Sequence, residues 1–600
     1  MYAGSDEDPG RGERTIKPTT QPQKHDPAAH DPHTEDGART RRSRAGRAAA
    51  GVALAIVFGA AAGALAYHFW THNVRYRHLA TSQWTPPREA DDYAGSLSCR
   101  ECHEKFYELW SPSHHGKAMQ PVDETLLQQA VQPLETPIRI GAATYAVDLR
   151  NQCMVERADG ERKTLPMLHA MGGKNVYFFL TPMSRGRLQV LPLAYDVRRK
   201  EWFDTTASMV RHFADPETED EAIDWRDPLL TFNTACYNCH VSQLDKNYDP
   251  KTDTYHTTWR EPGINCEACH GPGSEHNRVC RSVPKGTVPK DLKTILWSEF
   301  SHQQANDACA PCHAKMRTVA PRFMPGDRFF DHYDLVCLEN ADFYPDGRDL
   351  GENYTQTTWM LNPCVQSGML DCMHCHTSSG RFRQIDDPST SCLPCHARRV
   401  RTISEHSRHA TGGDNPTCVS CHMPMTEFAR MRRSDHSFRP PCPAASLEFG
   451  SPNSCTLCHT DQTDEWAAQQ VETWHPETRW RKRIMRVGSL VCAARRNEWT
   501  QLPAILEYIG SPASQPVVVT SLIRLLRTCP DTDKWPVLRR AAEHDSPLVR
   551  AAAAEVLTAD LDSPATRKRL FDALSDSYRL VRVRAAASLA ALPRENLEPE

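Results

Sequence analysis

The chain is poor in the apolar side chains that usually form the core of a large folded region. The residue types A, V, I, L, M, F, W, Y and C make up 39% of its 600 residues, aromatic residues make up 8%, and proline occurs 44 times. An excess of one charge is also lacking, because 71 Lys and Arg stand against 75 Asp and Glu. This balance gives no indication of nucleic-acid binding, which needs a basic surface. Folding must therefore draw buried apolar surface from another source.

Cysteine and histidine, by contrast, are abundant at 23 and 28 residues. Sixteen of the cysteines fall in eight Cys-x-x-Cys-His motifs, against roughly 0.04 motifs expected from random placement. This spacing lets two thiols add to the two vinyl groups of one haem, with the adjoining His as proximal iron ligand. Zinc sites and thioredoxin-like redox pairs are the alternatives, but a zinc fold would not demand a His directly after every pair.

The sequence therefore predicts eight covalently attached c-type haems. The predicted thioether cysteines are Cys99, Cys102, Cys236, Cys239, Cys266, Cys269, Cys309, Cys312, Cys372, Cys375, Cys392, Cys395, Cys418, Cys421, Cys455 and Cys458. The predicted proximal ligands are His103, His240, His270, His313, His376, His396, His422 and His459. Seven motifs lie within the 224 residues from Cys236 to His459, too densely for an ordinary side-chain core. We expect a mainly α fold with little regular structure around stacked haems, whose folding depends on them.

An uncharged run of 20 residues, from Ala48 to Tyr67, precedes the first motif. Its length matches a bilayer, and the arginines before it place the N-terminus in the cytoplasm. We expect a disordered tail at 1–47, a single transmembrane helix at 48–70 in the cytoplasmic (inner) membrane, and a linker at 71–94. A cleaved signal peptide is the alternative, because Ala64-Leu65-Ala66 resembles a cleavage site. Either interpretation places the haem region outside the cytoplasm, in a periplasmic or equivalent space.

Two further regions flank or interrupt the predicted octahaem domain at 95–465. Alternating β-rich runs around the hairpin signal Asp159-Gly160 predict a small β insertion at about 136–205. At 485–600, Val517, Val549 and Val581 recur every 32 residues in apolar helical segments, which predicts an α-solenoid of HEAT-like repeats. Such a solenoid either docks a partner protein or forms a stabilising cap.

The second axial ligand decides whether a haem only carries electrons or also binds substrate. Fourteen histidines after residue 95 lie outside the proximal positions, more than the eight that would close every iron. Positions relative to the motifs favour His115, His276, His409 and His436 as distal ligands, with His256 as a further candidate.

At these residues the sequence resembles the multihaem cytochrome c group that includes cytochrome c-554-type and octahaem proteins, relatives of hydroxylamine oxidoreductase and pentahaem nitrite reductase. The matching stretches are Cys99–Met119, Asn265–His276, Leu370–Gly380 and Cys418–Met425, and the C-terminal region resembles members with appended helical repeats. The resemblance implies closely packed haem pairs that pass electrons along a chain. The Cys-x-x-Cys-Lys motif typical of the nitrite reductases' catalytic haem is absent from this sequence.

We therefore expect a membrane-anchored, extracytoplasmic octahaem cytochrome that transfers electrons in a respiratory chain between redox partner proteins. From the topology, one partner would be a quinol-oxidising membrane complex. Two alternatives stay open. One is an oxidoreductase acting on nitrite, hydroxylamine or a similar small oxyanion at one open haem. The other is a scaffold that docks through the HEAT-like repeats.

Overall fold

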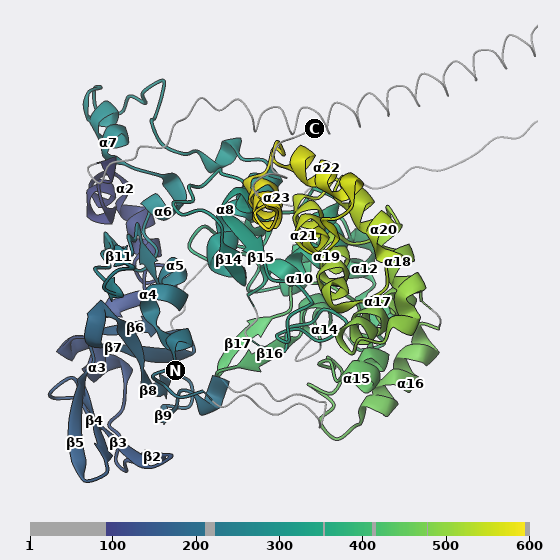
Figure 1. The fold of residues 1–600 in the computed structure, drawn as a ribbon. Helices are drawn as coiled ribbons and strands as arrows, with labels where there is room; N and C mark the ends of the chain where they lie inside the picture. The colour runs from purple at the N-terminus through teal and green to yellow at the C-terminus, as the bar shows by residue number, and fades with distance from the viewer. Residues whose placement is uncertain (1–91, 210–222, 352–353, 411–415, 477, 594–600) are drawn as a thin grey trace, which may run out of the picture. The chain divides into compact units, whose positions relative to one another are not determined.

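The computed structural model describes residues 92–209, 223–351, 354–410, 416–476 and 478–593 (Figure 1). The predicted tail, the predicted anchor and nearly all of the linker lie outside these ranges. Within them, no helix combines the length and the apolar content needed to cross a bilayer. All described residues belong to one compact unit, Thr85–Glu600.

The Cys-x-x-Cys-His motifs lie mostly on short helical turns separated by irregular chain. A helical turn brings residues i, i+3 and i+4 onto one face, which places both cysteines and the histidine of a motif on the same side. The first motif lies in α2 (Ser96–Trp110), where the backbone departs from helical geometry at His103. The other motif-bearing elements are α5 (Tyr237–His240), α6 (Glu267–His270), α8 (His302–His313), η6 (Cys372–His374), η7 (Pro388–Cys392) and α14 (Cys418–His422).

A β-rich segment separates the first motif from the second. Its four-stranded meander contains β2 (Ile138–Ile140), β3 (Ala143–Asp148), β4 (Cys153–Ala158) and β5 (Glu161–Pro166). Asp159 and Gly160 join the last two strands, both at positive φ, as a two-residue hairpin turn requires. The second antiparallel sheet has the order β1 (Met119–Pro121), β6 (His169–Gly172), β7 (Val176–Pro182), β8 (Leu188–Asp196), β9 (Glu201–Asp204). The expected β structure is therefore present, with one strand contributed from 119–121.

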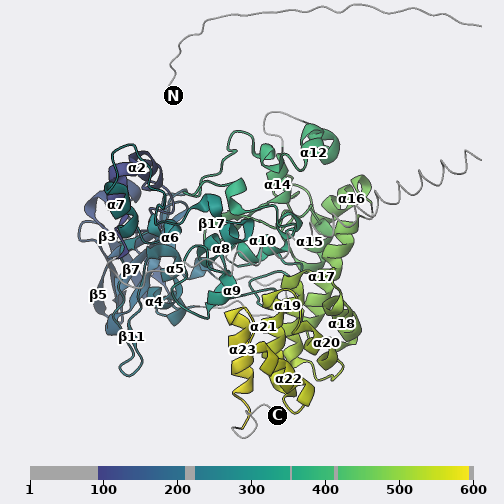
Figure 2. The ribbon, with the colours of Figure 1, turned by 90° about the horizontal axis from the view of Figure 1, so that it is seen from above.

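The C-terminal region folds into the predicted helical repeats (Figure 2). The helices are α17 (Arg479–Arg495), α18 (Leu502–Gly510), α19 (Pro516–Leu525), α20 (Lys534–Ala541), α21 (Pro547–Val556), α22 (Pro564–Ala573) and α23 (Arg579–Leu589). The repeating residues Val517, Val549 and Val581 all lie in the first turn of their helices, α19, α21 and α23, and all three are buried. A proline starts several of these helices, at the position where its missing N–H costs nothing.

One apolar core joins these repeats to the segment around the fourth motif. Ala310 directly follows Cys309 of that motif, and Ala314 directly follows its histidine. Both alanines belong to the same buried cluster as Leu335, Val517 and Leu548. Helix α23 packs on α9 (Phe329–His332), and α19 packs on α10 (Gln356–Leu361). The HEAT-like region is therefore not an appendage on a flexible tether.

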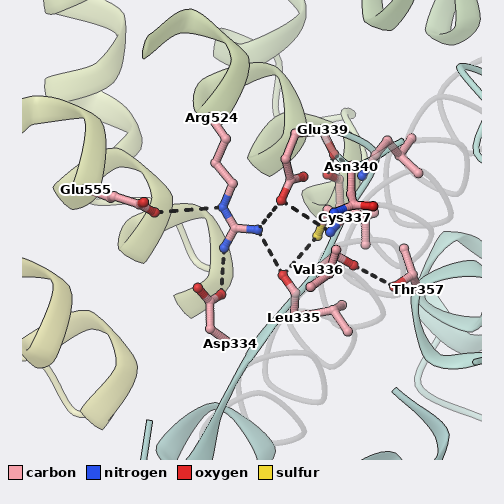
Figure 3. Close-up of polar contacts among 12 residues, drawn as sticks. Asp334, Leu335, Val336, Cys337, Glu339, Asn340, Thr357, Arg524 and Glu555 are labelled. Atoms are coloured by element: carbon pink, nitrogen blue, oxygen red, sulfur yellow. Dashed lines mark hydrogen bonds and ion pairs between the residues drawn. The ribbon is translucent and has the colours of Figure 1, made fainter. Parts of the chain in front are cut away.

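A buried ionic contact lies at this junction (Figure 3). Arg524 of α19 donates to Asp334 Oδ1 at 2.6 Å and to Glu339 Oε1 at 2.7 Å. It also donates to the carbonyl oxygen of Leu335 in β15 (Tyr333–Leu335) at 2.9 Å. Asp334 is fully buried and also pairs with Arg584 of α23. Burial alone would lower the pKa of Arg524, but Glu339 and Asp334 raise it above its usual value.

Replacing Arg524 by Met should destabilise the haem-loaded protein, because removing one partner of a buried ion pair costs about 3 kcal/mol. Calorimetry should show a thermal midpoint lowered by about 5 °C or more. The control is Lys568→Met in the same repeats, where the side chain is 76% exposed and pairs only with Asp572 four residues on. That variant should shift the midpoint by less than about 1 °C. Equal shifts in both variants would contradict the importance of the buried contact.

Candidate haem sites

A single large cavity connects most of the motifs. Its volume is about 4220 Å³, and residues of seven motifs line it, from Cys236 in the second to Cys455 in the eighth. Protein interiors normally contain few voids larger than a water molecule. A cavity of this size, lined by thiols and imidazoles, fits a stack of haem groups.

Five proximal histidines each face a second histidine at a similar distance. Two imidazoles bound to one metal from opposite sides, with bonds of about 2 Å, place their ring centres about 6 Å apart. The ring centres of these pairs are separated as follows: His103–His276, 6.3 Å; His115–His313, 6.3 Å; His376–His436, 6.4 Å; His406–His422, 6.3 Å; and His409–His459, 6.0 Å. Each spacing fits an iron between the two rings.

Hydrogen bonds orient four of the five distal rings, and His406 Nδ1 is buried without such a partner among the described residues. The Nδ1 atom lies 3.1 Å from the Ser378 carbonyl oxygen in His115 and 2.7 Å from the Leu292 carbonyl oxygen in His276. The corresponding distances are 2.6 Å in His409 and 2.8 Å in His436. A ring whose Nδ1–H donates to a carbonyl presents the lone pair of Nε2, which is the arrangement of a metal-bound histidine.

The protonation state of the buried rings also suits metal binding. Burial lowers the pKa of His313 to about 3 and lowers the pKa of His115 and His436. The rings therefore stay neutral at physiological pH, and neutral imidazole is the form that binds a metal.

Four of the five distal ligands predicted from the sequence face a proximal histidine. The structure brings His115, His276, His409 and His436 opposite proximal histidines, and adds His406, which the spacing argument had not selected. His406 lies only three residues before His409, so the two rings reach different motifs from one short segment. His256 is exposed beside β11 (Tyr248–Asp249) and β12 (Thr254–Tyr255), where its Nε2 lies 3.4 Å from Thr254 Oγ1. No proximal histidine of the described ranges faces it, so the structure does not support it as a ligand.

The other three proximal histidines have different surroundings. His240 Nδ1 lies 2.6 Å from the carbonyl oxygen of Ala118, and His270 Nδ1 lies 3.2 Å from that of Ile295. For His270 and His396, no opposing histidine ring occurs at the same separation within the part of the chain that the structure describes.

The thiols of different motifs lie next to one another, and this fixes the order of the attachment sites. The sulfur atoms of Cys99 and Cys266 lie close enough to interact, and so do those of Cys392 and Cys418. Cys309 likewise contacts Cys372, and Cys312 contacts Cys239. Three further motif pairs are close enough for one thiol to affect the other: Cys269 with Cys309, Cys375 with Cys392, and Cys421 with Cys455. The motifs therefore follow the spatial order one, three, four, five, six, seven, eight, with the second beside the fourth.

Comparisons with known proteins show which families the chain resembles. The family described as cytochrome c554 and c-prime matches residues 98–147 and 199–271, and the interval between them carries β4 to β8. HEAT repeats match residues 502–590. The C-type polyheme cytochrome OmcC of Geobacter sulfurreducens is 26% identical over 212 residues, or 32% of this chain and 26% of that protein. The multiheme cytochrome MtrA of Shewanella baltica is 22% identical over 195 residues, or 32% of this chain and 45% of that protein.

The chain is a multihaem cytochrome with HEAT-like repeats. Its cysteines carry covalently bound haem c. The alignments span about a quarter and about half of the two relatives' own lengths. The crystal structure of the outer cell wall cytochrome OcwA covers 83% of this cytochrome and 99% of its own chain, at 15% identity and a TM-score of 0.43.

The β insertion of this cytochrome contacts the hairpin that leads to His436. Strands β16 (Met425–Phe428) and β17 (Met431–Ser434) are joined by Ala429 and Arg430, both at positive φ. Such a turn favours Asn-Gly, and for other residues this conformation costs on the order of 1 kcal/mol each. Contacts with the β insertion offset that cost. The Ala429 N–H donates to the Ser208 carbonyl at 3.1 Å, and Arg430 pairs with Glu201 at 2.5 Å.

The same arginine packs against an aromatic ring, which holds the hairpin in register. The Arg430 guanidinium lies 4.1 Å from the ring centre of Phe203 in β9. At the far end of the hairpin, the Ser434 carbonyl oxygen lies within hydrogen-bond distance of His436 Nδ1. The β insertion thereby contacts the hairpin whose Ser434 carbonyl oxygen lies beside His436, although the insertion carries no motif of its own.

His406→Ala should leave the seventh haem without its distal ligand. The oxidised variant should show a high-spin EPR signal from about one haem in eight, because a five-coordinate or water-bound haem has a weaker ligand field. His544→Ala, in the solenoid, is the control and should keep the wild-type spectrum. An unchanged spectrum in His406→Ala would contradict the pairing with His422.

Arg430→Gln should disturb the fifth haem while leaving haem content unchanged. We expect partial high-spin character from that haem, because the strained turn loses an ion pair and a cation–π contact. Arg430→Lys, which keeps the charge, should show a smaller effect. The control is Arg162→Gln, an exposed residue of β5. If its EPR spectrum changes as much as that of Arg430→Gln, the hairpin does not position His436.

Proposed function

We propose that this protein is an extracytoplasmic octahaem cytochrome c that relays electrons between redox partners. The five histidine pairs carry the proposal, because an iron held between two imidazoles has no position left for a substrate. When bound, haem c supplies a one-electron couple at each site. The chain's own part is to fix each group by two thioethers and to orient the axial rings through carbonyl hydrogen bonds.

The order of the attachment sites supports a relay. The cysteines of successive motifs in this order are in contact or close enough to affect one another, and the second motif branches from the fourth. We propose the same order for the relay, so that the first, second and eighth sites are its ends. The proposed proximal ligands are the eight motif histidines. The proposed distal ligands are His115, His276, His406, His409 and His436.

We also propose that residues 48–70 anchor the protein in the cytoplasmic membrane with the haem region outside. The length of the apolar run and the arginines before it support this topology. A quinol-oxidising membrane complex is then the proposed electron donor, since an anchored cytochrome meets partners in the same membrane.

The buried junction bears on the scaffold alternative. Helices α19 and α23 pack on the cytochrome's own haem region, so a docking partner would have to use other faces of the repeats. Deleting 485–600 would also expose Ala310, Leu335 and their neighbours. A truncated chain is therefore a poor test of docking, and point substitutions on exposed helices are preferable.

Two measurements on the purified, oxidised protein test the proposed function. Intact-protein mass spectrometry should show eight attached haems, and seven in a Cys392→Ala/Cys395→Ala variant. EPR calibrated to haem content should show low-spin ferric haem at the five sites with paired histidines, and nitrite or hydroxylamine should leave the spectrum unchanged. A high-spin component near one haem in eight that shifts with either ligand would favour the oxidoreductase alternative.

A further inference from the structure

We propose that an arginine-rich surface beside the sixth motif docks an acidic redox protein. This surface, called here the basic surface, consists of Arg398, Arg401 and Arg408. The inference rests on the proposed function, because it requires a redox-active haem at Cys392–His396.

The basic surface lies in the segment directly after the sixth motif. Arg398 and Arg401 belong to helix α12 (Ala397–Arg401), which begins at the residue after His396, and Arg408 follows the last residue of α13 (Ile403–Ser407). All three arginines are exposed, and Figure 2 shows α12 at the margin of the ribbon. The three arginines are therefore close to the sixth motif in sequence and accessible to a partner protein.

The arginines are not explained by contacts within the protein. In the described ranges, no carboxylate lies within ion-pair distance of these guanidinium groups. The neighbouring Arg399 lines the haem cavity, where a haem propionate could bind it. None of the three arginines of the basic surface lines that cavity. Like charges three residues apart on a helix destabilise it slightly, so an unneutralised cluster is not favoured by folding alone.

The sign of the charge identifies the kind of partner. The chain carries a formal net charge of −4, and each haem c adds two propionates. A positive surface on a molecule that is negative overall attracts an acidic protein to one place and orients it there. Electron-transfer complexes are small and weak, so a few charges are enough to direct them.

The test compares two triple variants of the full-length, haem-loaded protein. One is Arg398→Gln/Arg401→Gln/Arg408→Gln. The other is Arg139→Gln/Arg150→Gln/Arg162→Gln, which removes three exposed arginines from the β insertion and so changes net charge equally. The electron donor is reduced flavodoxin, an acidic flavoprotein. Stopped-flow spectroscopy gives the second-order rate constant at ionic strengths of about 0.02 M and about 0.5 M.

We expect the basic-surface variant to react about tenfold more slowly than wild type at low ionic strength and to lose most of its salt dependence. The β-insertion variant should stay within about twofold of wild type, because its charges are far from a docking geometry. At high ionic strength all three rates should converge. A basic acceptor, oxidised mammalian cytochrome c, should take electrons from the pre-reduced protein at a rate that the basic-surface changes do not lower.

Other outcomes overturn the proposal and are distinguishable. Equal slowing of both variants would mean that net charge alone acts. Unchanged rates, together with loss of binding to phosphatidylserine vesicles only in the basic-surface variant, would assign the surface to a membrane instead. If wild-type haems are reduced by dithionite but exchange electrons with neither flavodoxin nor cytochrome c, the relay function itself fails. The EPR spectrum of each variant, expected to match wild type, separates loss of docking from loss of a haem.

Discussion

The gap between paired imidazoles is the constraint on which the rest of the structure depends. In His103–His276 and His406–His422 the ring centres lie 6.3 Å apart, which is the separation expected of two imidazoles bound to one iron from opposite sides. The chain therefore holds its paired histidines at a spacing that suits a haem iron between them. Carbonyl acceptors such as Ser378 and Leu292 keep the rings from rotating into that space. A side-chain core of ordinary composition is replaced here by bonds to a cofactor.

Two regions without haem motifs supply the rigidity that this arrangement needs. The β insertion contacts and stabilises the Ala429–Arg430 turn, which has a strained backbone. The solenoid shares its apolar core with the chain around the fourth motif. Both act through buried or half-buried arginines: Arg430 against Glu201, and Arg524 against Asp334. The HEAT-like repeats are therefore part of the cytochrome's own framework, whatever else they bind.

The sequence predicts features that depend on local contacts better than features that depend on contacts between distant segments. Some features depend on residues that are close in the chain and can be predicted from residue spacing. They are the haem motifs, the helical repeats and the Asp159-Gly160 hairpin. Distal ligation depends on tertiary contacts. His406 and His409 differ by three residues yet serve different motifs, and nothing in their spacing distinguishes them. His256 sits near the second motif in sequence but on an exposed hairpin in space. The Ala429–Arg430 turn lacks the usual Asn-Gly signal because tertiary contacts, not local preference, stabilise it.

The histidine pairs also differ greatly in how much chain each one closes. His406 and His422 are 16 residues apart, whereas His103 and His276 are separated by 173 and His115 and His313 by 198. Closing the longest of these loops costs about 2 kcal/mol more chain entropy than closing the shortest. The pair His406–His422 can form within one short segment, whereas the two pairs at the N-terminal end bring together segments that are far apart in the chain. Long-range tertiary contacts must therefore hold the N-terminal pairs in place to a greater extent than the C-terminal one.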